Sequence, residues 1–280
     1  MSKFPMFMRF PGGLRKAVTL SYDDGVEQDA QLIEILNRNG LKATFNLNSG
    51  LFAPEGTKYP AGQIHRRMSL AQAKALYAHS GHEVAVHCLT HASLTELTPS
   101  QIITEVMEDR KNLERYFGGI IRGMAYPFGT YNDQVAEVLD NCGIAYCRTV
   151  HSTHDFAIPQ DWLRLAATCH HDDPQLMPLT DRFLCEPVRH GARLFYLWGH
   201  AYEFEANNNW QRICEFAEKM GGHDDVWYAT NIEICDYHQA FCHLQFSADG
   251  QRVFNPTTIS VWFDMGDKSY CVKSGEMIDI

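Results

Sequence analysis

Long apolar runs are missing from this sequence. No uncharged apolar stretch approaches the roughly 20 residues that a membrane-spanning helix needs. The N-terminus is interrupted by Lys3, Arg9, Arg15 and Lys16, and no apolar segment of the signal-peptide type follows them. We therefore expect neither a membrane span nor a secretory signal.

Positive charge is also scarce. Lys and Arg together number 24 against 34 Asp and Glu, which gives a formal net charge of −10. Proteins that neutralise a nucleic-acid backbone or an anionic membrane surface need a basic face. The composition therefore predicts no nucleic-acid partner and no membrane partner.

Cysteine is present without the spacing of a cysteine framework. The chain has nine cysteines, an odd number, and no two of them form a C-x-x-C pair. A disulfide scaffold normally shows an even number at regular spacings. The pattern predicts a reduced, cytoplasmic protein.

Apolar material for a folded core is ample, at 45% of the 280 residues. This length allows two domains, but single α/β barrels also reach it. We expect an N-terminal arm over residues 1–16, an α/β barrel over 17–243 and a small antiparallel β appendage over 244–280. Alternating apolar runs separated by turns, such as the one at Ala248-Asp249-Gly250, indicate the appendage.

A unit of strand, capped helix, glycine and strand repeats through the first half of the chain. One such helix is predicted to begin with the capping box formed by Ser69 and Gln72, and to end near Gly81. Repeated units of this kind place a parallel sheet inside and helices outside, in an open sheet or a closed barrel. The long segment 48–67 is predicted to form one wall of a substrate cleft.

Two neighbouring carboxylates, Asp23 and Asp24, end the first buried strand. Adjacent acids at such a place are costly to desolvate unless a cation lies beside them. His87 and His91 follow another strand-like run, and we expect them to share one face of a helical turn. One carboxylate and two imidazoles with open coordination positions are typical of a catalytic metal site.

Two further motifs complete a familiar order. Tyr126-Pro127-Phe128-Gly129 follows a strand pattern, and His200 follows the apolar run 193–198. Together with Asp23-Asp24-Gly25 and His87-x-x-x-His91, these motifs resemble those of the polysaccharide deacetylase family (the NodB homology domain, carbohydrate esterase family 4) over roughly residues 17–240. The resemblance implies an α/β fold, a distorted (β/α) barrel of seven or eight units.

The resemblance also implies a role for each matching residue. Asp24, His87 and His91 would bind a divalent metal. Asp23 would act as the general base toward metal-activated water, and His200 would act as the general acid.

Around the reacting group, the resemblance places Tyr126, Pro127 and Phe128 beside the substrate, with the N–H of Phe128 helping to hold the oxyanion. Zinc is the expected metal, and iron, cobalt, nickel and manganese are alternatives. The run His170 to Asp173 is interpreted as a loop leading into a helix cap, in preference to a second metal site.

The sequence departs from the family pattern in two places. Relatives often carry an arginine shortly before the proline of the third motif, and here Arg122 or Arg148 would have to replace it. Relatives usually have Asp directly after the late histidine, where this chain has Ala201. The family's fourth motif, an Asp-Trp that helps to orient that histidine, is ambiguous as well. Asp161-Trp162 matches it in letters and Asp155-Phe156 fits the strand spacing, and the sequence leaves open which Asp, if any, has this role.

We predict an enzyme, a metal-dependent hydrolase that removes an amide-linked N-acetyl group from a carbohydrate-like small molecule or oligosaccharide. One alternative keeps the fold and the metal but hydrolyses a non-sugar amide, such as a cyclic ureide or imide. Another is a non-catalytic binding protein on a degenerate deacetylase scaffold. A homo-oligomer is compatible with the sequence, which does not indicate the oligomeric state.

Overall fold

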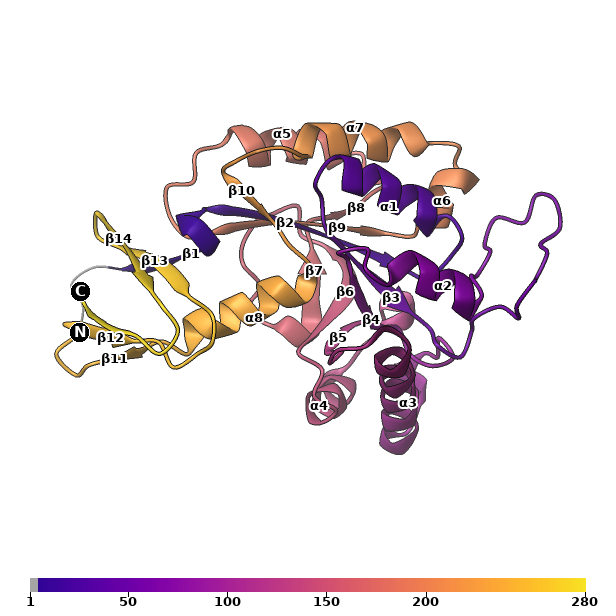
Figure 1. Cartoon of the computed structure of the whole chain (residues 1–280), viewed down its shortest axis with the longest axis horizontal. Coiled ribbons are helices and arrows are strands. Elements are labelled where there is room, and N and C mark those ends of the chain that lie inside the picture. The colour runs from indigo at the N-terminus through magenta and orange to yellow at the C-terminus, as the bar shows by residue number, and fades with distance from the viewer. Residues whose placement is uncertain (1–4) are drawn as a thin grey trace.

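The computed structural model describes residues 5–280, so residues 1–4 of the predicted N-terminal arm lie outside it. Parallel strands form the interior and helices lie around them (Figure 1). In sheet order the strands are β7 (Leu165–Ala167), β6 (Tyr146–Ser152), β5 (Gly123–Ala125), β4 (Glu83–Val86), β3 (Ala43–Leu47), β2 (Lys16–Asp23), β9 (Arg193–Gly199) and β8 (Cys169–His170).

Segment 165–170 closes this sheet into a ring. Its first half pairs with β6 and its second half pairs with β9, where His170 lies opposite Trp198. One edge of β2 pairs with β9, and the other edge is shared by two strands. On that second edge, β10 (Val226–Tyr228) pairs with the first half of β2 and β3 pairs with the second half. The ring thus has seven strands and a partial eighth, which confirms the predicted distorted (β/α) barrel.

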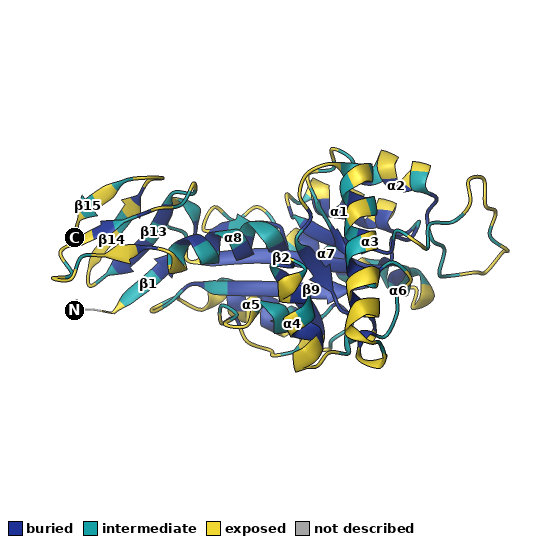
Figure 2. Cartoon of the chain, turned by 90° about the horizontal axis from the view of Figure 1, so that it is seen from below, coloured by how far each residue is buried: buried dark blue, intermediate teal, exposed yellow. Residues whose placement is uncertain are grey.

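The helices cover the outside of the ring and are held by local capping. Ser69 accepts a hydrogen bond from the backbone N–H of Gln72 in a capping box, and Thr230 does the same with Glu233. Every residue of β2 and β3 is buried, whereas the outer face of α3 is exposed (Figure 2). The helices are α1 (Asp29–Arg38), α2 (Leu70–Tyr77), α3 (Pro99–Phe117), α4 (Asp133–Asn141), α5 (Leu176–Cys185), α6 (Ala201–Ala206), α7 (Trp210–Met220) and α8 (Asn231–Cys242). Within residues 5–280, none of the helices has both the length and the apolarity that a bilayer crossing requires.

The C-terminal segment forms two small antiparallel sheets beside the barrel (Figure 1). β1 (Met6–Arg9), from the predicted arm, pairs with β13 (Val261–Met265), which in turn pairs with β14 (Lys268–Val272). The arm therefore belongs to an appendage sheet, and its Phe10 also packs on the barrel, against Trp227 of β10. The other sheet contains β11 (Gln245–Phe246), β12 (Arg252–Phe254) and β15 (Met277–Asp279).

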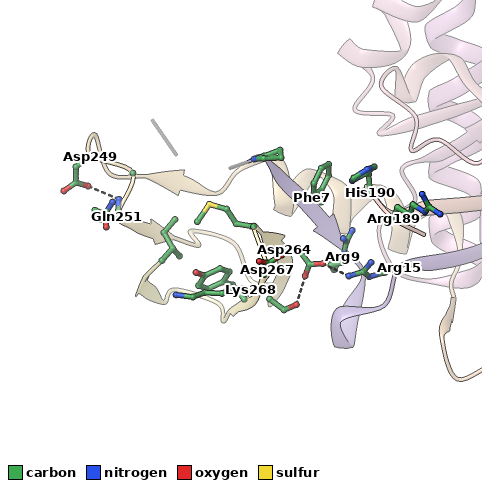
Figure 3. A pocket seen from close by; sticks show the side chains of 17 residues that line it. Phe7, Arg9, Arg15, Arg189, His190, Asp249, Gln251, Asp264, Asp267 and Lys268 are labelled. Carbon is green, nitrogen blue, oxygen red and sulfur yellow. Dashed lines mark hydrogen bonds and ion pairs between the residues drawn. The ribbon is translucent and has the colours of Figure 1, made fainter. Parts of the chain in front are cut away.

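A buried carboxylate fastens the appendage to the barrel (Figure 3). Asp264 of β13 accepts hydrogen bonds from Arg9 (2.7 Å), Arg15 (2.9 Å) and Ser269 (2.7 Å). A cavity of about 1050 Å³ lies beside this cluster. Its barrel-side lining includes Arg15 and His190, which come just before β2 and β9 begin. The cavity is therefore at the end of the barrel opposite to the predicted site.

Candidate active site

The predicted site residues lie where the barrel strands end, and several have a left-handed backbone. The φ angle is +83° at Asp24, +67° at Cys88, +57° at His91 and +58° at Phe128. Such conformations cost about 1–3 kcal/mol each in non-glycine residues and cluster at functional sites. The expected helical turn between the two histidines is wrong, because left-handed residues bend this segment irregularly. The rings of His87 and His91 nevertheless meet edge to face, with their centres 4.8 Å apart.

The carboxylate of Asp23 is buried and held from both sides. Its Oδ2 accepts a hydrogen bond from the guanidinium of Arg148, and its Oδ1 accepts one from Asn46 Nδ2 at 2.8 Å. The Nε2 atoms of His87 and His200 each lie 3.8 Å from Oδ2. Burial raises the pKa of Asp23, but the charge of Arg148 outweighs it and holds that pKa below its ordinary value. The group is therefore an ionised carboxylate.

Arg148 is one of the two candidates for the missing motif arginine, and it lies beside Asp23. Its side chain is fully buried, and its guanidinium carbon lies 4.4 Å from the centre of the Trp198 ring. Arg122, the other predicted candidate, donates to Asp236 of α8 at 2.7 Å. Of the two arginines, Arg148 is the one in contact with Asp23.

Asp24 has partners that the sequence analysis missed. Its Oδ1 accepts a hydrogen bond from Arg67 at 2.9 Å, and its Oδ2 lies 3.1 Å from His65 Nε2. Burial raises the pKa of Asp24, but the hydrogen bond to His65 and the charge of Arg67 outweigh it and hold the pKa far below its ordinary value. Both new partners come from segment 48–67, which was predicted to form a cleft wall. No motif in that segment singles them out.

Asp24, His87 and His91 present their ligand atoms within 4.8 Å of one another. The Nδ1 of His87 is 2.8 Å from the carbonyl oxygen of Ala125, so Nδ1 carries the proton and the lone pair is on Nε2. Burial lowers the pKa of His87, and burial also lowers the pKa of His91 to about 4. Two neutral imidazoles and an ionised carboxylate are a donor set that fits a divalent metal.

A second carboxylate supports this set from behind. The backbone N–H of His87 donates to Asp109 Oδ2 at 3.1 Å, and the N–H of Ser49 donates to the other oxygen at 2.6 Å. Asp109 is buried on α3, and burial raises its pKa to about 7. It therefore ties the loops after β3 and β4 to one helix.

The turn Tyr126–Gly129 brings one of its three predicted substrate residues to the metal ligands. The Phe128 ring is 64% exposed, and its centre lies 4.5 Å from that of His91. The N–H of Phe128 donates to no group of the described residues. Pro127 is buried, and the hydroxyl of Tyr126 donates to the carbonyl of Leu163 at 2.7 Å.

Gly129 fixes the shape of this turn. Its φ is +69°, and a Cβ there would lie only 2.4 Å from a methyl carbon of Val150. A side chain at this position would therefore displace either β6 or the turn that carries Phe128.

His200 lies between two carboxylates. Its Nε2 faces Asp23, and its Nδ1 lies 3.3 Å from an oxygen of Glu203 on α6. Burial lowers the pKa of His200, but Glu203 and Asp23 outweigh it and raise the pKa above its ordinary value. The spacing of three residues at the start of a helix is a local signal that could have revealed Glu203.

The two carboxylates predicted to orient His200 are occupied elsewhere in the described chain. Asp161 accepts hydrogen bonds from the backbone of Leu163 and Arg164, and Asp155 accepts one from the N–H of Phe156. Both residues therefore stabilise a turn or loop, and neither of these two candidates is the residue beside His200.

Comparison with known proteins agrees with this geometry. The polysaccharide deacetylase family model matches residues 11–147. The chitooligosaccharide deacetylase of Rhizobium leguminosarum bv. phaseoli is 26% identical over 55% of this chain and 60% of its own length. That of Sinorhizobium fredii is 28% identical over 53% of this chain and 60% of its own length. The matches thus span about three fifths of these relatives.

A solved structure extends the likeness of fold beyond the family match. It comes from Mycobacterium smegmatis, and its name places it with the polysaccharide deacetylases. It covers 86% of this chain and 96% of its own, with a TM-score of 0.59 and 16% identity. Taken with the order of the motifs along the barrel, the comparisons lead to one conclusion: residues 11–147 of this chain match the polysaccharide deacetylase family, within a fold that the solved structure shares.

Proposed function

We propose that this chain is a metal-dependent deacetylase that hydrolyses the N-acetyl amide of a carbohydrate-like substrate. The observation that carries the proposal is the convergence of Asp24, His87 and His91, with the separate carboxylate of Asp23 beside them. The names of the curated relatives support an N-acetylated oligosaccharide as the substrate class.

Asp24, His87 and His91 would hold the ion. When bound, a divalent metal supplies Lewis-acid polarisation of the acetyl carbonyl and makes water more acidic. The ligands are suited to this because both imidazoles are neutral near pH 7 and the carboxylate is ionised. Zinc fits the donor set, and iron, cobalt, nickel and manganese remain candidates.

Asp23 acts as the general base in this proposal. Its carboxylate takes the proton of the attacking water, and each of its oxygens keeps a lone pair beyond those that accept from Asn46 and Arg148. These two donors fix the orientation of the carboxylate. The N–H of Phe128 then donates to the oxyanion that develops on the acetyl carbonyl.

His200 acts as the general acid. The raised pKa favours the doubly protonated form of its ring. It gives the Nε2 proton to the leaving nitrogen, which would otherwise depart as a strongly basic amide anion. The products are acetate and the free amine.

The substrate class can be tested with a panel of compounds. We expect the purified protein to release acetate from N-acetylated chito-oligosaccharides and to leave cyclic ureides and imides unchanged. Enzymatic detection of acetate together with mass spectrometry of the sugar would measure both. Turnover of a ureide without release of acetate would overturn the proposal, and so would metal-loaded protein that hydrolyses nothing in the panel.

Removal of the metal is expected to abolish acetate release. Dialysis against dipicolinate should reduce the rate to background, because the carbonyl then loses its strongest polarising group. Adding back a divalent metal should restore the rate, and metal analysis should show that His91→Gln binds the ion more weakly. His243→Gln, at an exposed histidine that caps the C-terminal end of α8, is the matched control. Full activity in metal-free protein would contradict this prediction.

The pH profile should fall on its alkaline side when His200 loses its second proton. Since the folded pKa of His200 is raised, activity should persist above the ordinary value of 6.5 and decline only at higher pH. The ionised state of Asp23 persists to low pH, so the acid limb should instead reflect protonation of the metal ligands. Profiles of kcat/KM for wild type and His200→Asn would measure this. A variant that keeps the alkaline limb would contradict the assignment.

The predictions of domain boundaries and compartment stay predictions. All nine cysteines are free thiols in the structure, which supports a reducing compartment. We propose that the barrel over 17–243 carries the activity and that the appendage over 244–280, with β1, is a separate structural element.

A further inference from the structure

A cluster of three histidine rings surrounds one carboxylate next to the candidate site. Glu203 Oε2 lies 3.2 Å from His170 Nε2 and 3.2 Å from His171 Nε2, and Oε1 lies 3.3 Å from His200 Nδ1. The rings come from the ends of β8 and β9, and the carboxylate comes from the first turn of α6. Elements from three parts of the chain thus converge on Glu203.

The backbone is shaped to admit this cluster. His171 is fully buried, and a Cβ on Gly199 would lie only 2.1 Å from its Nδ1. Only a glycine at position 199 therefore lets the imidazole pack against β9. The ring of His171 also stacks on Tyr22, and its centre lies 4.1 Å from that of Phe204. Such close packing fixes the position of His171 and of its Nε2.

Helix capping alone does not account for the cluster. Glu203 does accept a hydrogen bond from the backbone N–H of His200 at 3.1 Å, as the third residue of a capping box. An ordinary capping carboxylate needs no other partner and is usually exposed to water. Here the side chain of Glu203 is only 24% exposed and faces three imidazoles.

A second metal site is also a poor account. The Nδ1 of His170 accepts a hydrogen bond from the backbone N–H of Asp172 at 3.1 Å. The proton of a neutral His170 is therefore on Nε2, the atom that faces Glu203, and it leaves no lone pair there for a metal. The same proton makes His170 a donor to the carboxylate, which suits an anion better than a cation in the centre.

We propose that Glu203 is the positioning residue for His200, and that His170 and His171 hold the carboxylate in place for this task. Glu203 would keep a proton on Nδ1 of His200, so that Nε2 is the atom that exchanges its proton toward the leaving nitrogen. The carboxylate thus fixes both the ring orientation and the tautomer. The expected effect of Glu203 on kcat rests on the proposed function, whereas its effect on the tautomer of His200 does not.

The charges around His200 are consistent with this arrangement. The acidic groups that face its ring are Glu203 from α6 with Asp23 and Asp24 from the end of β2. Burial raises the pKa of Glu203, but the ring nitrogens of His170, His171 and His200 beside the carboxylate outweigh it and hold the pKa far below its ordinary value. Glu203 therefore remains ionised when His200 is protonated and when it is deprotonated.

The test is Glu203→Gln, which removes the charge but keeps a residue that serves in a capping box. We expect kcat for acetate release to fall at least about tenfold, with KM unchanged. The loss should not exceed the contribution of the general acid itself, which is about 10²–10⁴-fold. In a His200→Asn background the same substitution should have no further effect on kcat. Glu205→Gln, two residues along the same helix and paired with Arg66, is the matched control.

A second readout does not depend on activity. Nitrogen-15 NMR of the histidine rings should show neutral His200 protonated on Nδ1 in the wild type, and a mixture of tautomers in Glu203→Gln. His170→Phe, which keeps a ring against Trp198 but removes the N–H, should produce a smaller change of the same kind.

Several results would overturn the proposal. These are wild-type kcat and tautomer in Glu203→Gln, an equal loss of kcat in the His200→Asn background, or loss of a bound metal ion in His170→Phe. If the wild-type protein releases no acetate from any substrate, the proposed function fails. The NMR comparison then still decides whether Glu203 positions His200.

Discussion

Asp23→Asn is expected to lower kcat for acetate release about 10²–10⁴-fold while the bound metal stays at its wild-type level. The amide of asparagine has nearly the shape of the carboxylate but cannot take a proton from water. Asp23 lies beside the predicted metal ligands without belonging to them, since the ligand atoms that converge are those of Asp24, His87 and His91. Rate and metal content, measured on the same preparation, would test the two roles together.

Asp24→Asn is the matched control for this prediction. The two residues are adjacent, both are buried carboxylates, and both carry an arginine partner. We expect Asp24→Asn to lose metal as well as activity. If Asp23→Asn keeps the wild-type rate, or if it loses its metal as Asp24→Asn does, the assignment of the base is wrong.

Arg148→Met is expected to destabilise the fold by about 3–5 kcal/mol, because it leaves the Asp23 carboxylate buried without its cation. The arginine side chain is fully buried and that of Asp23 is 4% exposed, so water cannot replace the lost partner. The free energy of unfolding in urea would measure the effect. Activity should fall as well, since the carboxylate loses the donor that orients it.

Two further variants serve as controls for this prediction. Arg122→Met removes an arginine whose ion pair with Asp236 is about one third exposed, and exposed pairs contribute only about 0.2–1 kcal/mol. The double variant Asp23→Asn/Arg148→Met removes both charges and should recover part of the lost stability. The stabilising role of the buried ion pair would be contradicted if Arg148→Met destabilised the fold no more than Arg122→Met. It would also be contradicted if the effects of Asp23→Asn and Arg148→Met on the free energy of unfolding were simply additive.

Much of the fold could be predicted because its signals are local. The capping box at Ser69 is predicted from two residues three apart in the sequence, and the structure confirms it. The closure of the ring is different, because segment 165–170 pairs with β6 at one end and β9 at the other. β1 likewise pairs with β13, more than 250 residues along the chain, which no local pattern indicates.

The site divides in the same way. The motifs that hold Asp24, His87 and His91 are short, and the sequence was enough to group them. The partner of Asp23 lies 125 residues away, so Arg122 and Arg148 could not be told apart until the strands were in register. Arg67 lies in a loop without regular structure, and nothing in its neighbours indicates that it reaches Asp24.

The central claim is that one aspartate and two histidines bind a divalent ion while the preceding aspartate stays free. Anomalous diffraction from crystals of the metal-loaded protein, collected at the zinc and iron edges, tests it most directly. We predict a peak about 2.0–2.2 Å from ligand atoms of Asp24, His87 and His91, with both oxygens of Asp23 beyond bonding distance. A peak bound to Asp23, or fully loaded protein without a peak at this position, would contradict the account.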